Sequence, residues 1–375
     1  MAVDVYLDHN ATTPVLPEVA DAMSEALRRT GNASSVHRFG RLVRRAVDDA
    51  RENVAALIGA SPANVIFTSG GTEANNQALR GASGTVFVSA VEHDSVFSAE
   101  PDAHTLPVDA DGVLDLDVLR RELAQTNAPA VVSVMLANNE TGVIQHVSEA
   151  AEIAHEFDAL LHCDAVQAAG KLAVDFAALG ADMLTLSAHK IGGPQGVGAL
   201  VLRDGLNLEP LIRGGGQERR RRAGTENVPG IVGFGVAAAS ASENVAAYGA
   251  VASLRDDLER RVRNAAPDAI IYGAAVARLP NTSCIGLPGV TGELQVMTLD
   301  LAGVAVSAGS ACSSGKVAPS HVLRAMGADE DAARSAIRVS LAADTTPEDV
   351  DRFVEVWSDM ARRRDIRHEN RRSVA

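Results

Sequence analysis

Short apolar runs rich in β-branched residues alternate with alanine-rich stretches between residues 65 and 202. The apolar runs have the length of buried strands, and the stretches between them show helical spacing. Strands that alternate with helices favour a sheet covered on both faces. The pattern therefore predicts an α/β fold with a mainly parallel sheet flanked by helices. The predicted strands are Val65–Thr68, Thr85–Ser89, Ala130–Leu136, Leu160–Asp164, Asp182–Ser187 and Gly198–Leu202, and helices are predicted at 72–79 and 148–158.

The second half of the chain has a different pattern. Two long helices are predicted at 228–245 and 250–265, the second with Leu254, Leu258 and Val262 at helical spacing. Short strands and helices follow in mixed order, which predicts a smaller α+β lobe. Its strands are predicted at 283–287, 304–307 and 336–340, and its helices at 292–302 and 347–363.

Composition narrows the class of protein. Of 375 residues, 46% are hydrophobic and only 3% aromatic, so aliphatic side chains must build the core. The net charge of -14 argues against nucleic acid as the main partner. No apolar run approaches the length of a membrane span, and acidic residues near the N-terminus argue against a signal peptide. We expect a soluble, cytoplasmic protein that binds neither nucleic acid nor membranes.

The cysteines support this expectation. Cys163, Cys284 and Cys312 are too few and too widely spaced for a disulfide framework. No CxxC pair suggests a zinc site, so no metal is expected. A reducing compartment is the natural setting for such a chain.

One lysine is unusual in this sequence. Only three of the 34 lysines and arginines are lysines, and Lys190 lies where an apolar run ends at a glycine-rich turn. Lysine is the side chain that can hold an aldehyde cofactor as a Schiff base. For Lys190 alone, the alternative is an ordinary solvated lysine at a strand end, so its neighbours decide between the two.

Polar groups follow five of the predicted strands where each strand ends, and α/β proteins bind ligands at these ends. The segment 69–73 offers two glycines and a helix start, which can donate N–H groups to an anion. The alternative is a helix cap with Thr72 as the N-cap residue. His93 can stack on a ring and move protons near neutral pH, although a structural histidine is the alternative.

The next two strand ends carry amides and a carboxylate. Asn138 and Asn139 can bond a ring hydroxyl or a carboxylate, or can form a turn before Gly142. Asp164 ends an apolar strand, with Gln167 three residues on. A carboxylate there needs a cationic partner, such as a protonated pyridine nitrogen. A helix cap is the alternative for Asp164.

The fifth strand end brings Ser187 and His189 next to Lys190. Taken together, the five ends supply an amine for an aldehyde, an acid for a ring nitrogen, a helix start for a phosphate and a histidine for a ring face. These groups meet the needs of pyridoxal 5'-phosphate (PLP).

A second reactive group lies in the small, polar, glycine-rich stretch 307–316. Such a stretch packs poorly and is expected to be mobile. Cys312 within it can act as a nucleophile, and the nearby Lys316 can favour the thiolate. An incidental surface cysteine is the alternative, whereas Cys163 and Cys284 lie in apolar strands and are expected to be structural.

The motifs together resemble the cysteine desulfurases of the NifS/IscS type, which are PLP-dependent enzymes of the aminotransferase class V group. The resemblance runs almost from end to end. It rests on the segments 6–14, 31–37, 69–76, 92–93, 138–140, 164–167, 187–190, 214–218, 222–227, 310–313 and 337–341.

The resemblance implies the PLP-dependent transferase fold type I, assembled as a homodimer. It implies a large PLP-binding domain at 13–248. The segments 1–12 and 249–375 would form a small domain that carries a mobile cysteine loop at about 307–319.

The resemblance also implies roles for individual residues. Catalysis would fall to Lys190, Cys312 and His93, and Arg338 with Asn139 would bind the substrate carboxylate. Asp164 would contact the pyridine nitrogen, and Thr225 the phosphate of the partner subunit's cofactor. The full set expected to bind the cofactor is Gly71, Thr72, Asn139, Asp164, Gln167, Ser187, His189 and Thr225.

The implied reaction converts L-cysteine to L-alanine and leaves the sulfur on Cys312 as a persulfide. A sulfur-accepting protein, such as an iron–sulfur scaffold, would take it from there. The alternatives are a selenocysteine lyase, a simple aminotransferase, and a non-catalytic sulfur-carrier or scaffold subunit. The sequence leaves the acceptor open between iron–sulfur assembly, tRNA thiolation and DNA modification.

Two stretches depart from the family pattern. The segment 77–107 is shorter than usual, which affects partner docking more than chemistry. The run 219–222 is more basic than the pattern requires. Its charges are expected to be solvated, with a partner-binding patch as the alternative.

Overall fold

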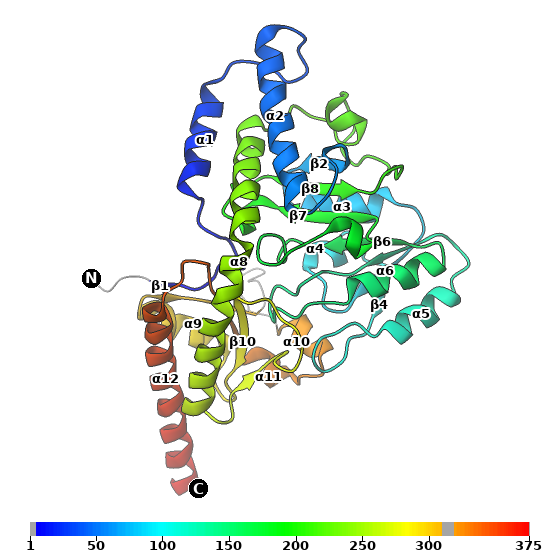
Figure 1. Ribbon diagram of the computed structural model, residues 1–375. Coiled ribbons are helices and arrows are strands. Elements are labelled where there is room, and N and C mark those ends of the chain that lie inside the picture. Colours follow the sequence, from blue (N-terminus) through cyan, green and yellow to red (C-terminus); the bar gives the residue numbers. More distant parts are fainter. Residues whose placement is uncertain (1–4, 310–318, 375) are drawn as a thin grey trace.

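The structure is a computed structural model that describes residues 5–309 and 319–374, with side chains up to Ile366. A seven-stranded sheet, ordered β2-β8-β7-β6-β5-β3-β4, forms the body of the larger part (Figure 1). Only β8 runs against its two neighbours, so the predicted mainly parallel α/β sheet is confirmed. The strands are β2 (Val65–Thr68), β3 (Thr85–Ser89), β4 (His104–Leu106), β5 (Ala130–Ser133), β6 (Leu160–Asp164), β7 (Met183–Ser187) and β8 (Gly198–Leu202).

Side chains of this sheet alternate between two cores. On β2, Val65 and Phe67 face one core, and Ile66 faces the other. This period of two follows from the pleat, and burial on both faces explains the continuous apolar runs in the sequence. Helices cover both faces: α3 (Gly71–Gly81), α4 (Asp94–Phe97), α5 (Leu116–Ala124), α6 (Val147–Glu156) and α7 (Phe176–Leu179).

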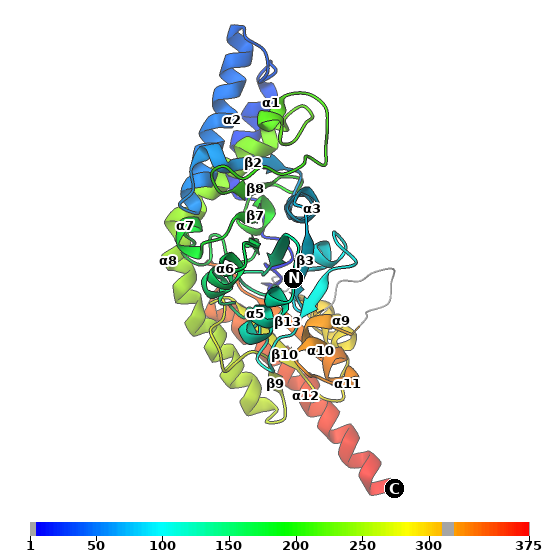
Figure 2. The same cartoon turned by 90° about the vertical axis from the view of Figure 1, so that its right-hand side faces the viewer.

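Three helices pack together at one end of the sheet, where Figures 1 and 2 show α1 (Pro17–Arg28) and α2 (Arg38–Leu57) beside α8 (Val228–Ala265). The approach of α2 to α8 is close because Gly235 has no side chain. A Cβ added there would lie 2.5 Å from the Cα of Ala50. Contacts of this kind allow an alanine-rich chain to pack densely with few aromatic residues.

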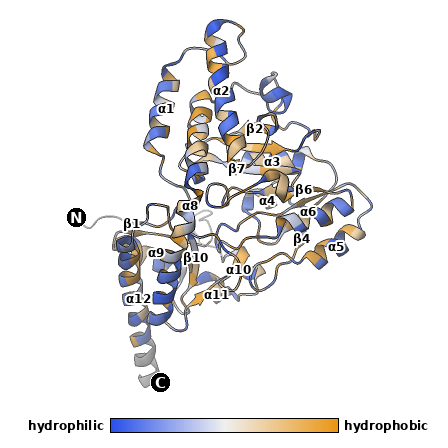
Figure 3. Cartoon of the chain, in the orientation of Figure 1, coloured by the Kyte–Doolittle hydropathy of each residue, from blue (hydrophilic) through white to orange (hydrophobic). Residues whose placement is uncertain are grey.

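The smaller part is built on an antiparallel four-stranded sheet, ordered β12-β13-β10-β9. A parallel pair, β1 with β11, lies beside it. Its core surrounds the fully buried Trp357 and Phe353, while the outer side of the last helix is polar (Figure 3). The elements are β1 (Val5–Tyr6), β9 (Ile270–Ile271), β10 (Thr282–Gly286), α9 (Gly292–Leu301), β11 (Val304–Ala305), β12 (Ser307–Ala308), α10 (His321–Ala325), α11 (Glu330–Arg334), β13 (Ala336–Ser340) and α12 (Pro347–Val374).

The structure corrects several element boundaries, and β5, predicted as 130–136, ends at Ser133. The two helices predicted at 228–245 and 250–265 are one continuous helix, α8, of 38 residues. Gly249 does not break it because a single exposed glycine costs only about 1 kcal/mol, and both halves are held by packing. The strand predicted at 304–307 divides into β11 and β12, which pair with different sheets. Helix α12 continues past Arg363 to Val374.

Helix α8 runs through the boundary predicted near residue 248, and the division into two domains stays a prediction. Across residues 5–309 and 319–374, no helix has both the length and the hydropathy needed to cross a membrane.

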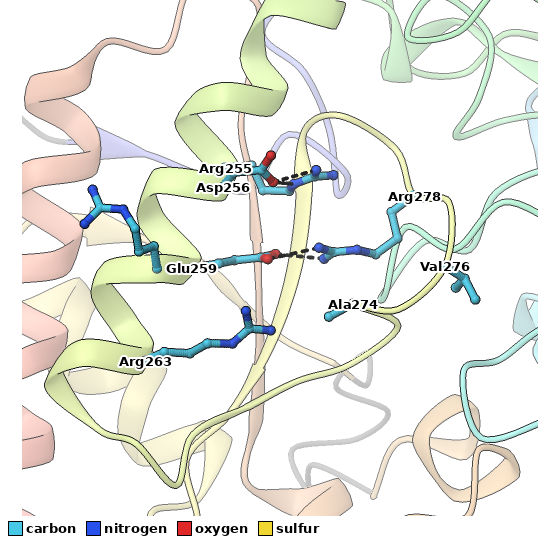
Figure 4. A pocket seen from close by; sticks show the side chains of 8 residues that line it. Arg255, Asp256, Glu259, Arg263, Ala274, Val276 and Arg278 are labelled. Atoms are coloured by element: carbon cyan, nitrogen blue, oxygen red, sulfur yellow. Dashed lines mark hydrogen bonds and ion pairs between the residues drawn. The ribbon is translucent and has the colours of Figure 1, made fainter.

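A buried ion pair ties the second half of α8 to the chain before β10 (Figure 4). Arg278 donates to both carboxylate oxygens of Glu259, at 2.7 and 2.9 Å, and each side chain is 6% exposed. The pair lines a polar pocket of about 350 Å³ that contains none of the predicted site residues. Removing one member of such a pair strands the other charge away from water.

We expect Arg278→Ala to lower the free energy of unfolding by about 3–5 kcal/mol, because Glu259 would remain buried without its cation. Urea unfolding followed by circular dichroism measures this loss. The control is Arg29→Ala in the exposed Arg29–Glu25 pair, which should cost less than about 1 kcal/mol. Equal losses in the two variants would contradict the structural role given to the buried pair.

Candidate active site

The five polar strand ends of the sequence meet at one edge of the sheet. Strands β3, β5, β6 and β7 are parallel, and β2 shares their direction because both β2 and β7 are antiparallel to β8. Their carboxyl ends therefore lie at the same edge. The chain leaves these ends toward Gly71, His93, Asn139, Asp164 and Lys190.

A cavity of about 430 Å³ opens at the start of α3. Helix α3 has Gly70 as its N-cap residue, and no side chain caps it, so the alternative with Thr72 as N-cap is wrong. A helix start of this kind presents N–H groups to an anion. A Cβ added at Gly71 would lie 3.1 Å from Val166, which shows how closely the backbone approaches the neighbouring strand end. The cavity is lined by Ala11, Thr12, Ser69, Gly70, Gly71, Thr72, Glu73, Ser187, His189, Gln195 and Gly196.

Lys190 is largely buried beside this cavity. Its Nζ donates to the backbone carbonyls of Asn10 at 2.5 Å and Ala11 at 2.8 Å. Burial, reinforced by the Arg338 guanidinium, lowers the pKa of Lys190 to about 8. The solvated lysine considered as an alternative is therefore wrong. The neutral amine is the form that attacks carbonyl carbons. A lowered pKa increases the fraction of Lys190 in that form.

Lys190 also affects the histidine beside it. His189 Nδ1 lies 3.2 Å from Thr12 Oγ1, at the mouth of the cavity. Burial and the Lys190 charge lower the pKa of His189 to about 4. His189 is therefore neutral near pH 7 and can act as a hydrogen-bond donor or acceptor to a group in the cavity.

Asn10 connects the Lys190 amine to residues of both parts of the molecule. Its backbone oxygen accepts from Lys190 and from Gln167 Nε2, at 2.5 and 2.9 Å. Its side-chain amide donates to Thr282 at 2.9 Å, and its backbone N–H donates to Ser340 Oγ. The N-terminal segment thus joins the Lys190 edge of the large sheet to strands β10 and β13.

A second amine lies behind Asn10. Lys171 is 2% exposed, and its Nζ donates to Asn10 Oδ1 at 3.0 Å and to Gln167 Oε1 at 2.8 Å. Burial, with smaller contributions from the charges of Lys190 and Arg338, lowers the pKa of Lys171 well below its usual range. Because both hydrogen-bond partners are uncharged, this site stabilises a neutral amine better than a cation.

Asp164 and His93 are joined by two intervening side chains. Asn75 Nδ2 donates to Asp164 Oδ2 at 2.8 Å and to Ser95 Oγ at 2.9 Å. Ser95 Oγ lies 2.8 Å from His93 Nδ1. Asp164 Oδ1 also accepts from the N–H of Val166 at 3.0 Å, so both carboxylate oxygens have partners.

Arg338 projects from β13 into an ion pair. Its Nη2 lies 2.7 Å from Asp8 Oδ1, and its Nη1 donates to the Asn139 carbonyl at 3.0 Å. Asp8 Oδ2 accepts from Ser307 Oγ at 2.7 Å. The buried Nε of Arg338 has no partner within the described chain. The guanidinium is therefore held in a fixed orientation.

Two buried carboxyls stand close to these groups. Burial and the Asp164 charge raise the pKa of Glu92 well above its usual range, and its Oε1 accepts from the Met135 N–H at 2.5 Å. Burial raises the pKa of Glu140 to about 7, and its Oε2 accepts from Ser320 Oγ at 2.6 Å.

Not all predicted site residues come together. Thr225 is exposed and lines a separate cavity of about 140 Å³, which shares Ser69 and Gly196 with the larger one. The backbone oxygen of Asn139 bonds Arg338, and so the contact of Asn139 with a ring hydroxyl stays a prediction. Cys312 lies outside the described residues.

The arginines of the basic run 219–222 differ in their exposure to solvent. Arg219 and Arg220 are exposed, as expected. The expectation of a solvated charge is wrong for Arg222, whose Nε donates to Glu73 Oε1 at 2.8 Å with both side chains largely buried. Arg222 therefore orients the first turn of α3, next to the predicted phosphate site.

Several residues that organise the site were not predicted from the sequence: Asp8, Asn10, Asn75, Glu92, Ser95, Glu140 and Lys171. Lys171 had a signal, because it is one of only three lysines. Glu92 and Glu140 adjoin predicted residues. Asn75 had none, since Asp164 lies 89 residues away on another element. Ser95 lies two residues from the predicted His93, at the start of the same helix.

A mainly parallel sheet with a buried lysine, a carboxylate and an uncapped helix start at its strand ends is typical of the fold type I class of PLP-dependent transferases. Comparisons with known proteins agree. Residues 5–353 match the model of the aminotransferase class-V family. The chain belongs to this family.

Relatives and solved structures refine the comparison. A cysteine desulfurase of Cereibacter sphaeroides is 47% identical over 368 residues, 94% of each chain. The cysteine desulfurase IscS of Dictyoglomus turgidum is 42% identical, covering 95% of this chain and 94% of its own. A NifS-like protein from Rickettsia africae matches at a TM-score of 0.89 with 36% identity, over 95% of this chain and 99% of that one. The resemblance to NifS/IscS-type cysteine desulfurases is confirmed.

The lowered pKa of Lys190 has a measurable consequence in the cofactor-free protein. The rate of acetylation at Lys190, followed by peptide mass spectrometry, should rise with pH through about 8 and then level off. The sign follows from burial, which disfavours the charged amine and so leaves it neutral at lower pH. A rate that keeps rising to about pH 10.4, the range of an ordinary lysine, would contradict the buried position of the amine.

Proposed function

We propose that this chain is a PLP-dependent cysteine desulfurase that converts L-cysteine to L-alanine and takes the sulfur as a persulfide on Cys312. The observation that carries the proposal is the Lys190 amine, buried with a lowered pKa beside an anion-binding cavity at the carboxyl ends of five strands. Relatives named as cysteine desulfurases, at 42–47% identity, support the choice of reaction.

The residues present fit PLP. The uncapped start of α3, the Ser187 hydroxyl and His189 line a cavity suited to a phosphate. Asp164, held by Asn75, offers a carboxylate to a ring nitrogen, and Lys190 offers the amine. When bound, PLP supplies an electron sink for the electron pair released at the substrate α-carbon.

Substrate binding and proton transfer are assigned to side chains of this protein. Arg338, already oriented by Asp8 and the Asn139 carbonyl, offers a planar guanidinium that can bind the substrate carboxylate. Lys190 moves the α-proton, for which a pKa near operating pH is favourable. His93 serves as its acid–base partner. Gln167, fixed by Asn10 and Lys171, is assigned to the hydroxyl region of the ring.

The sulfur step balances with one thiol. The Cys312 Sγ thiolate attacks the substrate sulfur, the substrate C–S bond breaks and an S–S bond forms. The carbon fragment gains a proton and leaves as L-alanine. Cysteine and enzyme thiol thus give alanine and enzyme persulfide, with no external oxidant.

The same proposal covers the oligomeric state of the protein and the acceptor of its sulfur. We place Thr225 at the cofactor phosphate of a partner subunit in a homodimer, which accounts for an exposed threonine outside the main cavity of its own chain. A sulfur-accepting protein, such as an iron–sulfur scaffold, would receive the persulfide. The sparse cysteines favour the cytoplasm.

Replacing Cys312 by Ala should leave the visible absorbance of the bound cofactor intact and abolish sulfide release from cysteine, because the acceptor thiol is gone. Sulfide and alanine are assayed in parallel, on cysteine and on selenocysteine. The matched control is Cys284→Ala, whose thiol is fully buried and has a raised pKa, so activity should be kept. Full alanine production by Cys312→Ala would defeat the assignment.

Borohydride reduction of the holoenzyme should place one pyridoxyl group on Lys190, since reduction fixes the imine as a stable amine. Peptide mapping identifies the site. Lys171 is the internal control, because it is fully buried behind Asn10 and should carry no label. Lys190→Ala should lose both label and turnover. A label on any other lysine would refute the role of Lys190.

A further inference from the structure

Four side chains form a continuous line of hydrogen bonds beneath the proposed cofactor site. Asp164 ends β6, Asn75 lies on α3, Ser95 lies on α4, and His93 is the N-cap residue of α4. Asn75, Ser95 and Asp164 are at most 7% exposed, whereas His93 is open at the strand edge. The bonds are Asp164 Oδ2 to Asn75 Nδ2 at 2.8 Å, Asn75 Nδ2 to Ser95 Oγ at 2.9 Å, and Ser95 Oγ to His93 Nδ1 at 2.8 Å.

The direction of each bond is fixed by chemistry. The Asn75 NH₂ group can only donate, and it supplies one hydrogen to Asp164 and one to Ser95. The backbone N–H of Ser95 donates to His93 Nδ1 at 3.1 Å, so Nδ1 is the unprotonated nitrogen. The Ser95 hydroxyl accepts from Asn75 and donates to the same Nδ1. His93 is therefore the tautomer with its proton on Nε2.

The orientation of Asn75 indicates function rather than stability. Its Oδ1 is buried without a partner in the described chain. Turning the amide over would place its oxygen against the Asp164 carboxylate, where two acceptors would face each other. A buried acceptor left unpaired is unfavourable, and an apolar side chain of similar size would avoid it. The amide is needed for the two residues to which it donates.

We propose that Asn75 and Ser95 are positioning residues that couple Asp164 to His93. Through them, the carboxylate assigned to the ring nitrogen and the histidine assigned to the ring face are held by one network. His93 then presents Nε2–H, a donor, to the site. This inference rests on the roles given to Asp164 and His93 in the proposed function.

A matched pair of variants measures the contribution of the Ser95 hydroxyl. Ser95→Val and Ser95→Thr add the same bulk, but only threonine keeps the O–H. On the holoenzyme, we expect Ser95→Val to lower kcat by about tenfold with KM changed less than about twofold, because a positioning loss slows proton transfer more than substrate binding. Ser95→Thr should recover most of kcat.

The far end of the network is tested with Asn75→Leu, which keeps the size and removes the donors. It should lower kcat by a similar factor, again about tenfold. The double variant Asn75→Leu/Ser95→Val should be no slower than the slower single one, because the two residues act in series. Ser98→Val, on the exposed end of α4, and Asn244→Ala, exposed on α8, are controls expected to match the parent.

A spectroscopic readout is independent of turnover. Long-range ¹H–¹⁵N spectra of histidine-labelled holoenzyme, assigned by the signal lost in His93→Gln, report the His93 tautomer and the hydrogen bond to Nδ1. The parent should show Nε2–H. Both Ser95→Val and Asn75→Leu should shift the Nδ1 resonance in the same direction, although Asn75 does not touch His93.

The outcomes separate this inference from the proposed function. An unshifted Nδ1 signal in Asn75→Leu, or equal kcat for Ser95→Val and Ser95→Thr, would overturn the coupling. Multiplicative losses in the double variant would do the same, since they indicate two independent structural roles. If the parent itself fails to desulfurate cysteine while the Nδ1 shifts appear, the proposed function fails and the coupling stands.

Discussion

The backbone carbonyl of Asn10 is the point on which the geometry of this site depends. It accepts from the Lys190 amine and from Gln167, while the Asn10 side chain bonds Lys171, Asn281 and Thr282. The turn that follows β1 thus holds the Lys190 amine and links it to β10. Because Lys190 is held away from water by this segment, its amine is neutral at a pH where an ordinary lysine is charged.

Much of the fold was predictable because it follows from local rules. Continuous apolar runs such as Leu160–Asp164 mark strands buried on both faces, and parallel strands bring their carboxyl ends to one edge. This rule places Gly71, Asp164 and Lys190 together without knowledge of any contact. The family resemblance then supplied roles for residues such as Arg338 and Thr225, which lie far from that edge in the sequence and have no local signal.

The features that could not be predicted from the sequence depend on contacts between distant segments. The bond from Asn75 to Asp164 spans 89 residues, and that from Lys171 to Asn10 spans 161. No periodicity or composition encodes such pairs, because each depends on how two elements pack. The same holds for α8, whose sequence suggests a break near Gly249. Packing against α2 and α1 on one half and α12 on the other holds one helix through that point.

Continuity of α8 has a consequence for how the molecule loses its structure. Phe234 in its first half belongs to the core of the large sheet, and Leu258 in its second half belongs to the core around Trp357. A helix of 38 residues, about 57 Å long, is a single hydrogen-bonded rod that both cores share. Melting either core exposes part of this rod and removes support from the other. We therefore expect the two cores to unfold as one cooperative unit.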